Sequence, residues 1–130
     1  RDVQSRRGLA LLLISHDLGV VGEMAARVVV MYAGRVVETG PVRAVLRTPA
    51  HPYTAGLLAC MPTLARRSML QPIPGTIPDM SHRPSGCAFH PRCAVRVAAC
   101  ATVCPDLVAT TAHEPGHAAR CLLVSTAAPS

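Results

Sequence analysis

The histidine of Ser15-His16-Asp17 directly follows a continuous aliphatic run, residues 9–14. Such a run predicts a strand buried on both faces, as in a parallel sheet. Open α/β sheets bind their ligands beyond the carboxyl ends of the strands. An imidazole there could donate a hydrogen bond to a phosphate oxygen, or it could simply bond to a nearby carbonyl. Spacing alone favours the second, structural interpretation of His16.

The last part of the chain, residues 87–130, contains five of the six cysteines. It has a single phenylalanine, and ordering costs on the order of 1.5 kcal/mol per residue, so burial alone will hardly hold it together. A disulfide or metal staple is expected, and a reducing cytoplasm disfavours disulfides. Only Cys100 and Cys104 have the two to four intervening residues of a zinc knuckle. Spacing alone does not choose between zinc and an iron–sulfur cluster.

Other side chains of the tail could join such a site. The candidate additional ligands are His90, His113 and His117. Three arginines could offset the negative charge of bound thiolates: Arg92, Arg96 and Arg120. For both groups the favoured interpretation is that they are solvated surface residues. Cys60 precedes the tail and is expected to be a small buried hydrophobe.

The elements that would position these residues can be read from periodicity and turn residues. A helix is expected after residue 17, with Ser15 or Asp17 as its N-cap and with apolar residues at helical spacing, namely Leu18, Val21, Ala25 and Val28. Two β-branched runs flank Ala33-Gly34 and predict a hairpin. Short helices are expected over residues 42–49 and from Pro52 to Pro62. Residues 62–86, rich in proline, predict an extended linker.

Composition narrows the class of protein. The 130 residues include 13 basic residues, all arginine, and the net charge is +6. This balance would suit nucleic acid, an anionic membrane face or phosphate ligands. Residues 9–14 are too short for a signal-peptide core or a membrane span. The apolar residues are mostly small and aliphatic, so a core of small aliphatic contacts is expected. Because the chain begins with Arg1, it is expected to be a fragment or a processed product.

The order strand, "SHD", helix and "VVVMYAGRVVETG" resembles the end of an ATP-binding-cassette (ABC) ATPase. The resemblance implies that His16 is the switch histidine of the H-loop, contacting the γ-phosphate of ATP near the attacking water. The P-loop, glutamine loop, signature helix and acidic strand end of that family, which hold ATP with Mg²⁺, are absent here. The chain therefore resembles the C-terminal piece of such an enzyme and is not expected to hydrolyse ATP alone.

Four further segments narrow the resemblance: "HPYTAGLLACMPTL", "PIPGTIPDM", "GCAFHPRC" and "GHAARC". They are similar to the C-terminal extension of oligopeptide and dipeptide importer ATPases, and nickel importers share parts of it. That family associates the tail with a [4Fe–4S] cluster, which implies Cys87, Cys93, Cys100 and Cys121 as ligands, with Cys104 a possible substitute for the third. His51, Pro52 and Tyr53 are interpreted as a helix start rather than as substrate contacts.

The expected fold is α/β: the C-terminal part of a P-loop ATPase domain (1–48), an importer extension with a proline-rich linker (49–86) and a metal-stapled tail (87–130). The resemblance implies a peptide-importer subunit at the cytoplasmic face of the inner membrane. Its implied partners are a second ATP-binding subunit and membrane-spanning permease subunits, with peptide reached through the transporter and no nucleic acid. Two alternatives are a zinc module that binds nucleic acid through its arginines, and a truncated, non-functional product. Scattered arginines without an aromatic platform disfavour nucleic-acid binding.

Overall fold

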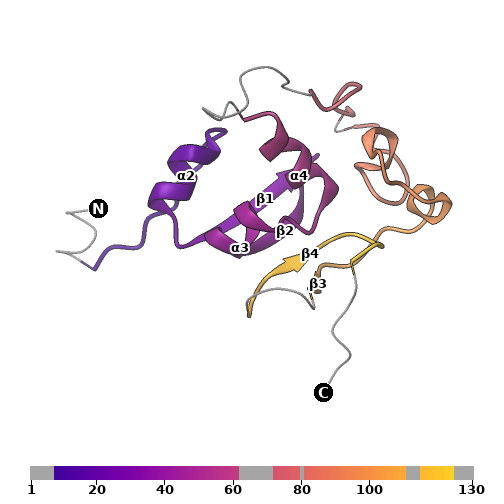
Figure 1. The fold of residues 1–130 in the computed structure, drawn as a ribbon. Coiled ribbons are helices and arrows are strands. Elements are labelled where there is room, and N and C mark those ends of the chain that lie inside the picture. The colour runs from indigo at the N-terminus through magenta and orange to yellow at the C-terminus, as the bar shows by residue number, and fades with distance from the viewer. Residues whose placement is uncertain (1–7, 62–71, 80, 111–114, 125–130) are drawn as a thin grey trace.

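The computed structural model describes residues 8–61, 72–79, 81–110 and 115–124. Its elements are α2 (Leu18–Met24), β1 (Arg27–Tyr32), β2 (Arg35–Pro41), α3 (Val42–Arg47), α4 (Pro52–Ala59), the 3₁₀ helices η1 (His90–Arg92) and η2 (Ala98–Ala101), β3 (Val108–Ala109) and β4 (Ala118–Ala119). Figure 1 shows the hairpin near the centre, the orange segments of the tail at the right, and β4 in yellow beside the hairpin. The described residues contain no helix with the length and apolarity needed to cross a membrane.

The hairpin of β1 and β2 forms where the sequence predicts it. The strands pair antiparallel, with Tyr32 opposite Arg35 beside the turn. Ala33 and Gly34 both have positive φ, 46° and 74°, as the two central residues of a type I′ turn require. The register shifts between Val30 and Met31, which bends the strand locally.

The tail adds two strands that the sequence does not predict. The sheet order is β1-β2-β4-β3, and every neighbouring pair is antiparallel. Ala119 of β4 stands opposite Glu38 of β2 on one side and Val108 of β3 on the other. Each of the new strands has two residues, too few for an alternating pattern to be visible in sequence. The cysteine-bearing tail therefore shares a sheet with the hairpin.

The strand expected over residues 9–14 does not form. These residues have no regular secondary structure and are exposed; Leu12 and Ile14 are 87% and 90% accessible. A buried parallel strand requires neighbours on both sides and helices on both faces. Within the described residues, the sheet offers residues 9–14 no such place.

The helices start largely as predicted, although all three end earlier than expected. Helix α2 is capped by Asp17 and ends at Met24, because Val28 belongs to β1 instead. Helix α3 stops at Arg47, before Pro49. Helix α4 starts at Pro52 and ends at Ala59, with Cys60 as its C-cap.

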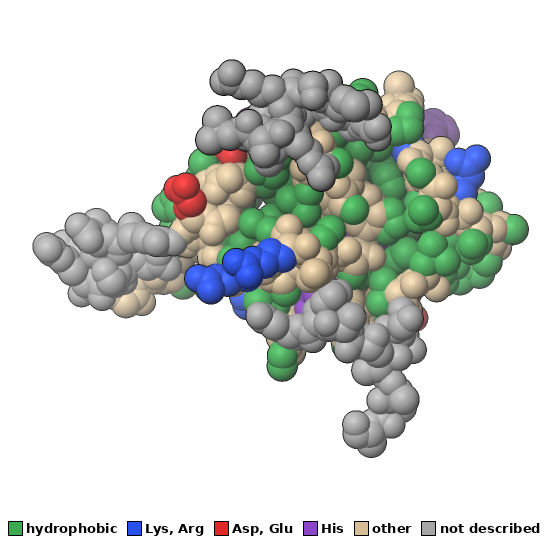
Figure 2. Space-filling view, viewed as in Figure 1, with side chains coloured by type: hydrophobic (Ala, Val, Ile, Leu, Met, Phe, Trp, Pro, Cys, Tyr) green, Lys and Arg blue, Asp and Glu red, His purple; other side chains and the backbone are tan. Residues whose placement is uncertain are grey.

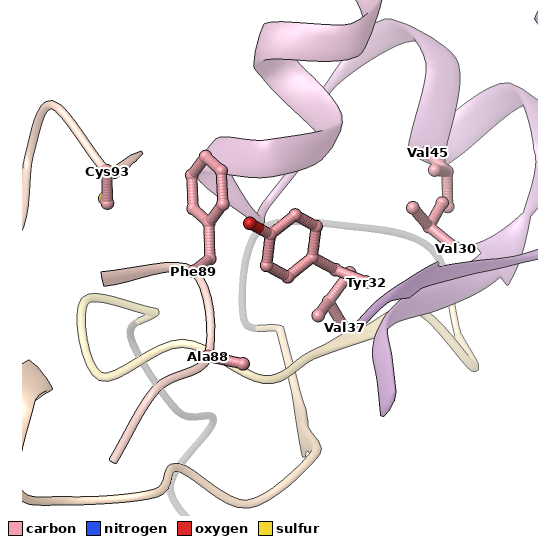
Figure 3. Close-up of a cluster of buried hydrophobic side chains, with 7 residues drawn as sticks. All are labelled: Val30, Tyr32, Val37, Val45, Ala88, Phe89 and Cys93. Atoms are coloured by element: carbon pink, nitrogen blue, oxygen red, sulfur yellow. The ribbon is translucent and has the colours of Figure 1, made fainter. Parts of the chain in front are cut away.

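The core adds aromatic rings to the small aliphatic contacts that the composition predicts: Tyr32 and Phe89 are buried, and the partly buried Tyr53 packs against them. Phe89 of the tail packs against Tyr32 of β1 and Tyr53 of α4, with ring centroids 5.2 and 5.4 Å apart. The buried cluster consists of Val30, Tyr32, Val37, Val45, Ala88, Phe89 and Cys93 (Figure 3). Hairpin, helix and tail thus share one core.

Candidate functional site

His16 lies in a bend directly before α2, and it is exposed. Its neighbours bind the local backbone: the Ser15 Oγ accepts from the Asp17 N–H, 3.0 Å away, and the Asp17 carboxylate accepts from Gly19 and Val20. Asp17 therefore caps α2 and Ser15 supports the turn before it, whereas His16 is exposed.

Four tail cysteines lie close enough to influence one another. Burial raises the pKa of the Cys87 thiol, and Cys100 and Cys121 raise it further. Burial likewise raises the pKa of the Cys121 thiol, with added contributions from Cys93 and Cys100. Cys93 and Cys100 are buried, and Cys87 and Cys121 are half-buried. Cys100 and Cys121 therefore lie near Cys87, and Cys93 and Cys100 lie near Cys121.

A backbone hydrogen bond joins the two ends of the loop between Cys87 and Cys100. The Cys87 N–H donates to the Cys100 carbonyl at 2.9 Å. Gly86 has φ +67°, and a Cβ there would collide with the Cys100 carbonyl and the Thr102 backbone. Only glycine allows the two segments to approach this closely.

The fifth tail cysteine, Cys104, has different surroundings. It is exposed, and its thiol accepts a hydrogen bond from the Arg35 guanidinium. Cys60 on α4 is half-buried rather than buried as expected.

In the part of the chain that the structure describes, no group of three or more His, Cys, Asp or Glu side chains is arranged to hold a metal ion. Of the candidate histidine ligands, His90 is half-buried, and its Nδ1 lies 2.9 Å from the Cys87 carbonyl. His117 is 1% exposed, so its interpretation as a solvated loop residue is wrong. His113 lies outside the described residues.

His117 belongs to a buried polar cluster that the sequence analysis missed. Its Nε2 lies 2.7 Å from Oε1 of Glu38, and both side chains are fully inaccessible. The Glu38 carboxylate also accepts hydrogen bonds from the Ala50 and His51 N–H groups. Glu38 and His117 are 79 residues apart, and no local pattern links them.

Two tail arginines donate hydrogen bonds to other segments of the chain instead of only facing solvent. Arg92 donates to the carbonyls of Ile73 and Pro74 in the linker, at 3.0 and 2.8 Å, and it also donates to the Tyr32 hydroxyl. Arg120 donates from its side chain to the carbonyls of Val36 and Pro105. Arg96 is exposed, as expected.

His51 is the N-cap of α4, as the sequence predicts for the helix start. Its Nδ1 accepts a hydrogen bond from the Tyr53 N–H at 3.0 Å, so the ring is neutral in this geometry. Burial lowers the pKa of His51 to about 4, whereas Glu38 and a hydrogen bond with the Arg120 backbone act to raise it. The histidine ring therefore joins the α4 start to the tail in its uncharged form.

Acidification should destabilise the protein through His51. Its pKa is about 4 when folded and 6.5 ordinarily, so between these values the unfolded chain binds more protons. The contribution of His51 to stability is therefore complete above pH 6.5, and it falls by up to about 3 kcal/mol as the pH drops to about 4. Urea unfolding at a series of pH values measures this loss.

The matched control for this titration is His51→Asn, which keeps a capping oxygen without a titratable ring. Its stability should depend much less on pH between 6.5 and 4. His82→Asn, at an exposed histidine, should retain the wild-type dependence. An equal acid loss in His51→Asn and the wild type would show that another group is responsible.

Comparison with known proteins identifies the region that this fold represents. The family model described as "Oligopeptide/dipeptide transporter, C-terminal region" matches residues 37–100. That range begins in β2 and ends at Cys100, so it covers the α4 start and three of the clustered cysteines.

Curated relatives extend the likeness to nearly the whole chain. A protein of Brucella ovis, named as a peptide import ATP-binding protein, is 49% identical over 129 residues, which is 94% of this chain and 37% of the relative. A Brucella melitensis protein with the same description is 45% identical over 122 residues, 93% of this chain and 36% of the relative. The chain thus spans little more than a third of the length of these relatives. It carries the region described as the C-terminal region of oligopeptide/dipeptide transporters, and over most of its length it is similar to peptide import ATP-binding proteins.

Proposed function

We propose that the chain is the C-terminal part of an ATP-binding subunit of a peptide-importing ABC transporter. The likeness to peptide import ATP-binding proteins along 94% of the chain carries this proposal. The subunit would bind ATP with Mg²⁺ between itself and a second ATP-binding subunit. It would drive membrane-spanning permease subunits from the cytoplasmic face of the inner membrane, and peptide would contact the transporter rather than this chain.

The exposed aliphatic run at residues 9–14 supports this assembly. Six consecutive apolar residues in water are unfavourable, and the sheet of a complete P-loop domain would cover them. His16 would then stand at the end of a buried strand, where ligands of α/β sheets bind. Its role in this proposal is to donate a hydrogen bond to the γ-phosphate and to help position the attacking water.

For the tail we propose that Cys87, Cys93, Cys100 and Cys121 hold a structural [4Fe–4S] cluster, and that Cys104 is dispensable. The proximity of these four thiols supports it. The cluster would order the tail, and zinc is the alternative occupant. The division into residues 1–48, 49–86 and 87–130 remains part of this proposal.

The nucleotide role is tested by His16→Ala in the full-length protein, reconstituted with its transporter. A hydrogen bond to a charged group is worth roughly 1.5–3 kcal/mol, and about 1.36 kcal/mol corresponds to tenfold in rate. ATP turnover should therefore fall by roughly ten- to a hundredfold, while ATP affinity changes less because other groups hold the nucleotide. His82→Ala, at an exposed histidine of the linker, should turn over normally. Unchanged turnover in His16→Ala would leave His16 a merely structural residue.

The substrate class is tested separately, by uptake into cells that carry the transporter. Labelled dipeptides and oligopeptides should accumulate, and uptake should fall in parallel with ATP turnover in His16→Ala. Accumulation of nickel without peptide would instead assign the transporter to the nickel importers.

A further inference from the structure

The Glu38 carboxylate collects hydrogen bonds from two separate parts of the chain. It is fully buried. Oε1 lies 2.8 Å from the Ala50 nitrogen and 2.7 Å from His117 Nε2, and Oε2 lies 3.0 Å from the His51 nitrogen. A buried carboxylate is costly unless donors surround it, and here three N–H groups do so. Glu38 thus joins β2, the start of α4 and the tail.

The tail segment that meets Glu38 fits closely against β2. The His117 ring packs over Gly40, where an added Cβ would come within 3.0–3.2 Å of the ring and its backbone. At the residue before His117, the Arg27 guanidinium donates to the Gly116 carbonyl at 2.9 Å. The His117 imidazole therefore packs against β2 at Gly40, where a larger side chain would not leave room for the ring.

From this contact the chain runs directly to a clustered cysteine. The Arg120 N–H donates to the Val37 carbonyl at 2.8 Å, and its side chain donates to the carbonyls of Val36 and Pro105. Cys121 is the next residue, and it interacts with Cys93 and Cys100. Only three residues therefore lie between His117, which Glu38 holds, and Cys121.

We propose that Glu38 is a positioning residue for the cysteine site: through His117 it holds β4 on β2 and so keeps Cys121 beside the other three thiols. The effect on a bound cluster rests on the function proposed above. The effect on β4 does not, because it depends only on contacts within the chain. An acidic residue of the hairpin would in this way control a site formed by the tail.

Amide hydrogen exchange in the full-length protein tests the proposal locally. The amides of Arg120 and Thr110 report on β4, because they donate to the carbonyls of Val37 and His117. His117→Leu removes the donor to Glu38 and should speed exchange at both amides by roughly ten- to a hundredfold. His117→Gln, whose side-chain amide can still donate, should stay within about threefold of the wild type. The Ala25 and Thr48 amides, in turns of α2 and α3, should be unaffected.

Glu38→Gln provides the second arm, because it keeps the size of the side chain while removing its charge. It should speed exchange at Arg120 and Thr110, and combining it with His117→Leu should add little at these two amides, since both variants reach β4 through the Glu38–His117 contact. Additive effects, no change at these amides, or an equal increase at Ala25 and Thr48 would overturn the proposal. The last result would mean that the pair supports the whole fold rather than positioning the tail.

The consequence for the cysteine site is measured as the rate at which a chelator removes iron from anaerobically purified protein. His117→Leu should lose iron at least tenfold faster than His117→Gln. Equal rates would overturn the part of the proposal that concerns Cys121. A wild-type protein with no iron and no sulfide would overturn the proposed cluster, whereas the exchange rates would still decide whether Glu38 holds β4.

Discussion

Cys93→Ser is expected to abolish the brown chromophore of the anaerobically purified protein and to leave the tail open to proteases. Cys93 is 7% exposed and belongs to the buried cluster with Phe89 and Ala88. Metal binding to a site absent from the unfolded chain appears as folding free energy, about 10–16 kcal/mol for structural zinc in small peptides. A cluster held at four chain positions could contribute as much, so loss of one ligand should affect residues 87–121 together. Iron and sulfide analysis, visible absorption and limited proteolysis measure the outcome.

Cys104→Ser is the matched control for this prediction. Its thiol is exposed and contacts Arg35, so the variant should keep both colour and protease resistance. Stoichiometric zinc without sulfide in the wild type would contradict the cluster. Loss of colour in Cys104→Ser, together with its retention in Cys100→Ser, would make Cys104 the third ligand.

Phe89→Ala should lower the free energy of unfolding by about 3–5 kcal/mol, the usual cost of deleting a buried aromatic ring. Phe89 is 3% exposed and meets the rings of Tyr32, Tyr53 and His51 at centroid distances of 5.2, 5.4 and 5.8 Å. These partners lie in β1, at the start of α4 and directly before it. The variant should therefore separate the tail from the hairpin and α4, and urea unfolding measures the loss.

Val95→Ala is the control for this large effect, because Val95 lies in the same tail and is 54% exposed. Its cost should stay within about 0.5 kcal/mol. Hydrophobic side chains occupy much of the surface shown in Figure 2, so an apolar residue of the tail need not be a core residue. A loss below about 1 kcal/mol in Phe89→Ala would show that the tail folds without this aromatic contact.

The sequence by itself determined the features that depend on neighbouring residues. Ala33-Gly34 predicted the hairpin because positive φ at two successive positions is a local requirement. Asp17 and the His51-Pro52 pair predicted two helix starts, because a cap and a proline at the first helical position act within one turn. The choice of four cysteines followed from the family resemblance rather than from their spacing, and their role as ligands stays a prediction.

Only the tertiary structure decided which distant segments meet. Glu38 and His117 are 79 residues apart, and neither has a neighbour that predicts its partner. Strands β3 and β4 have two residues each, so β4 depends on the edge that β2 offers, and β3 on the edge that β4 offers. Residues 9–14 show the opposite case: they have the composition of a buried strand, but they lie exposed where no described strand pairs with them. Strand formation and the burial of charge both depend on partners supplied by the fold, which a local pattern cannot encode.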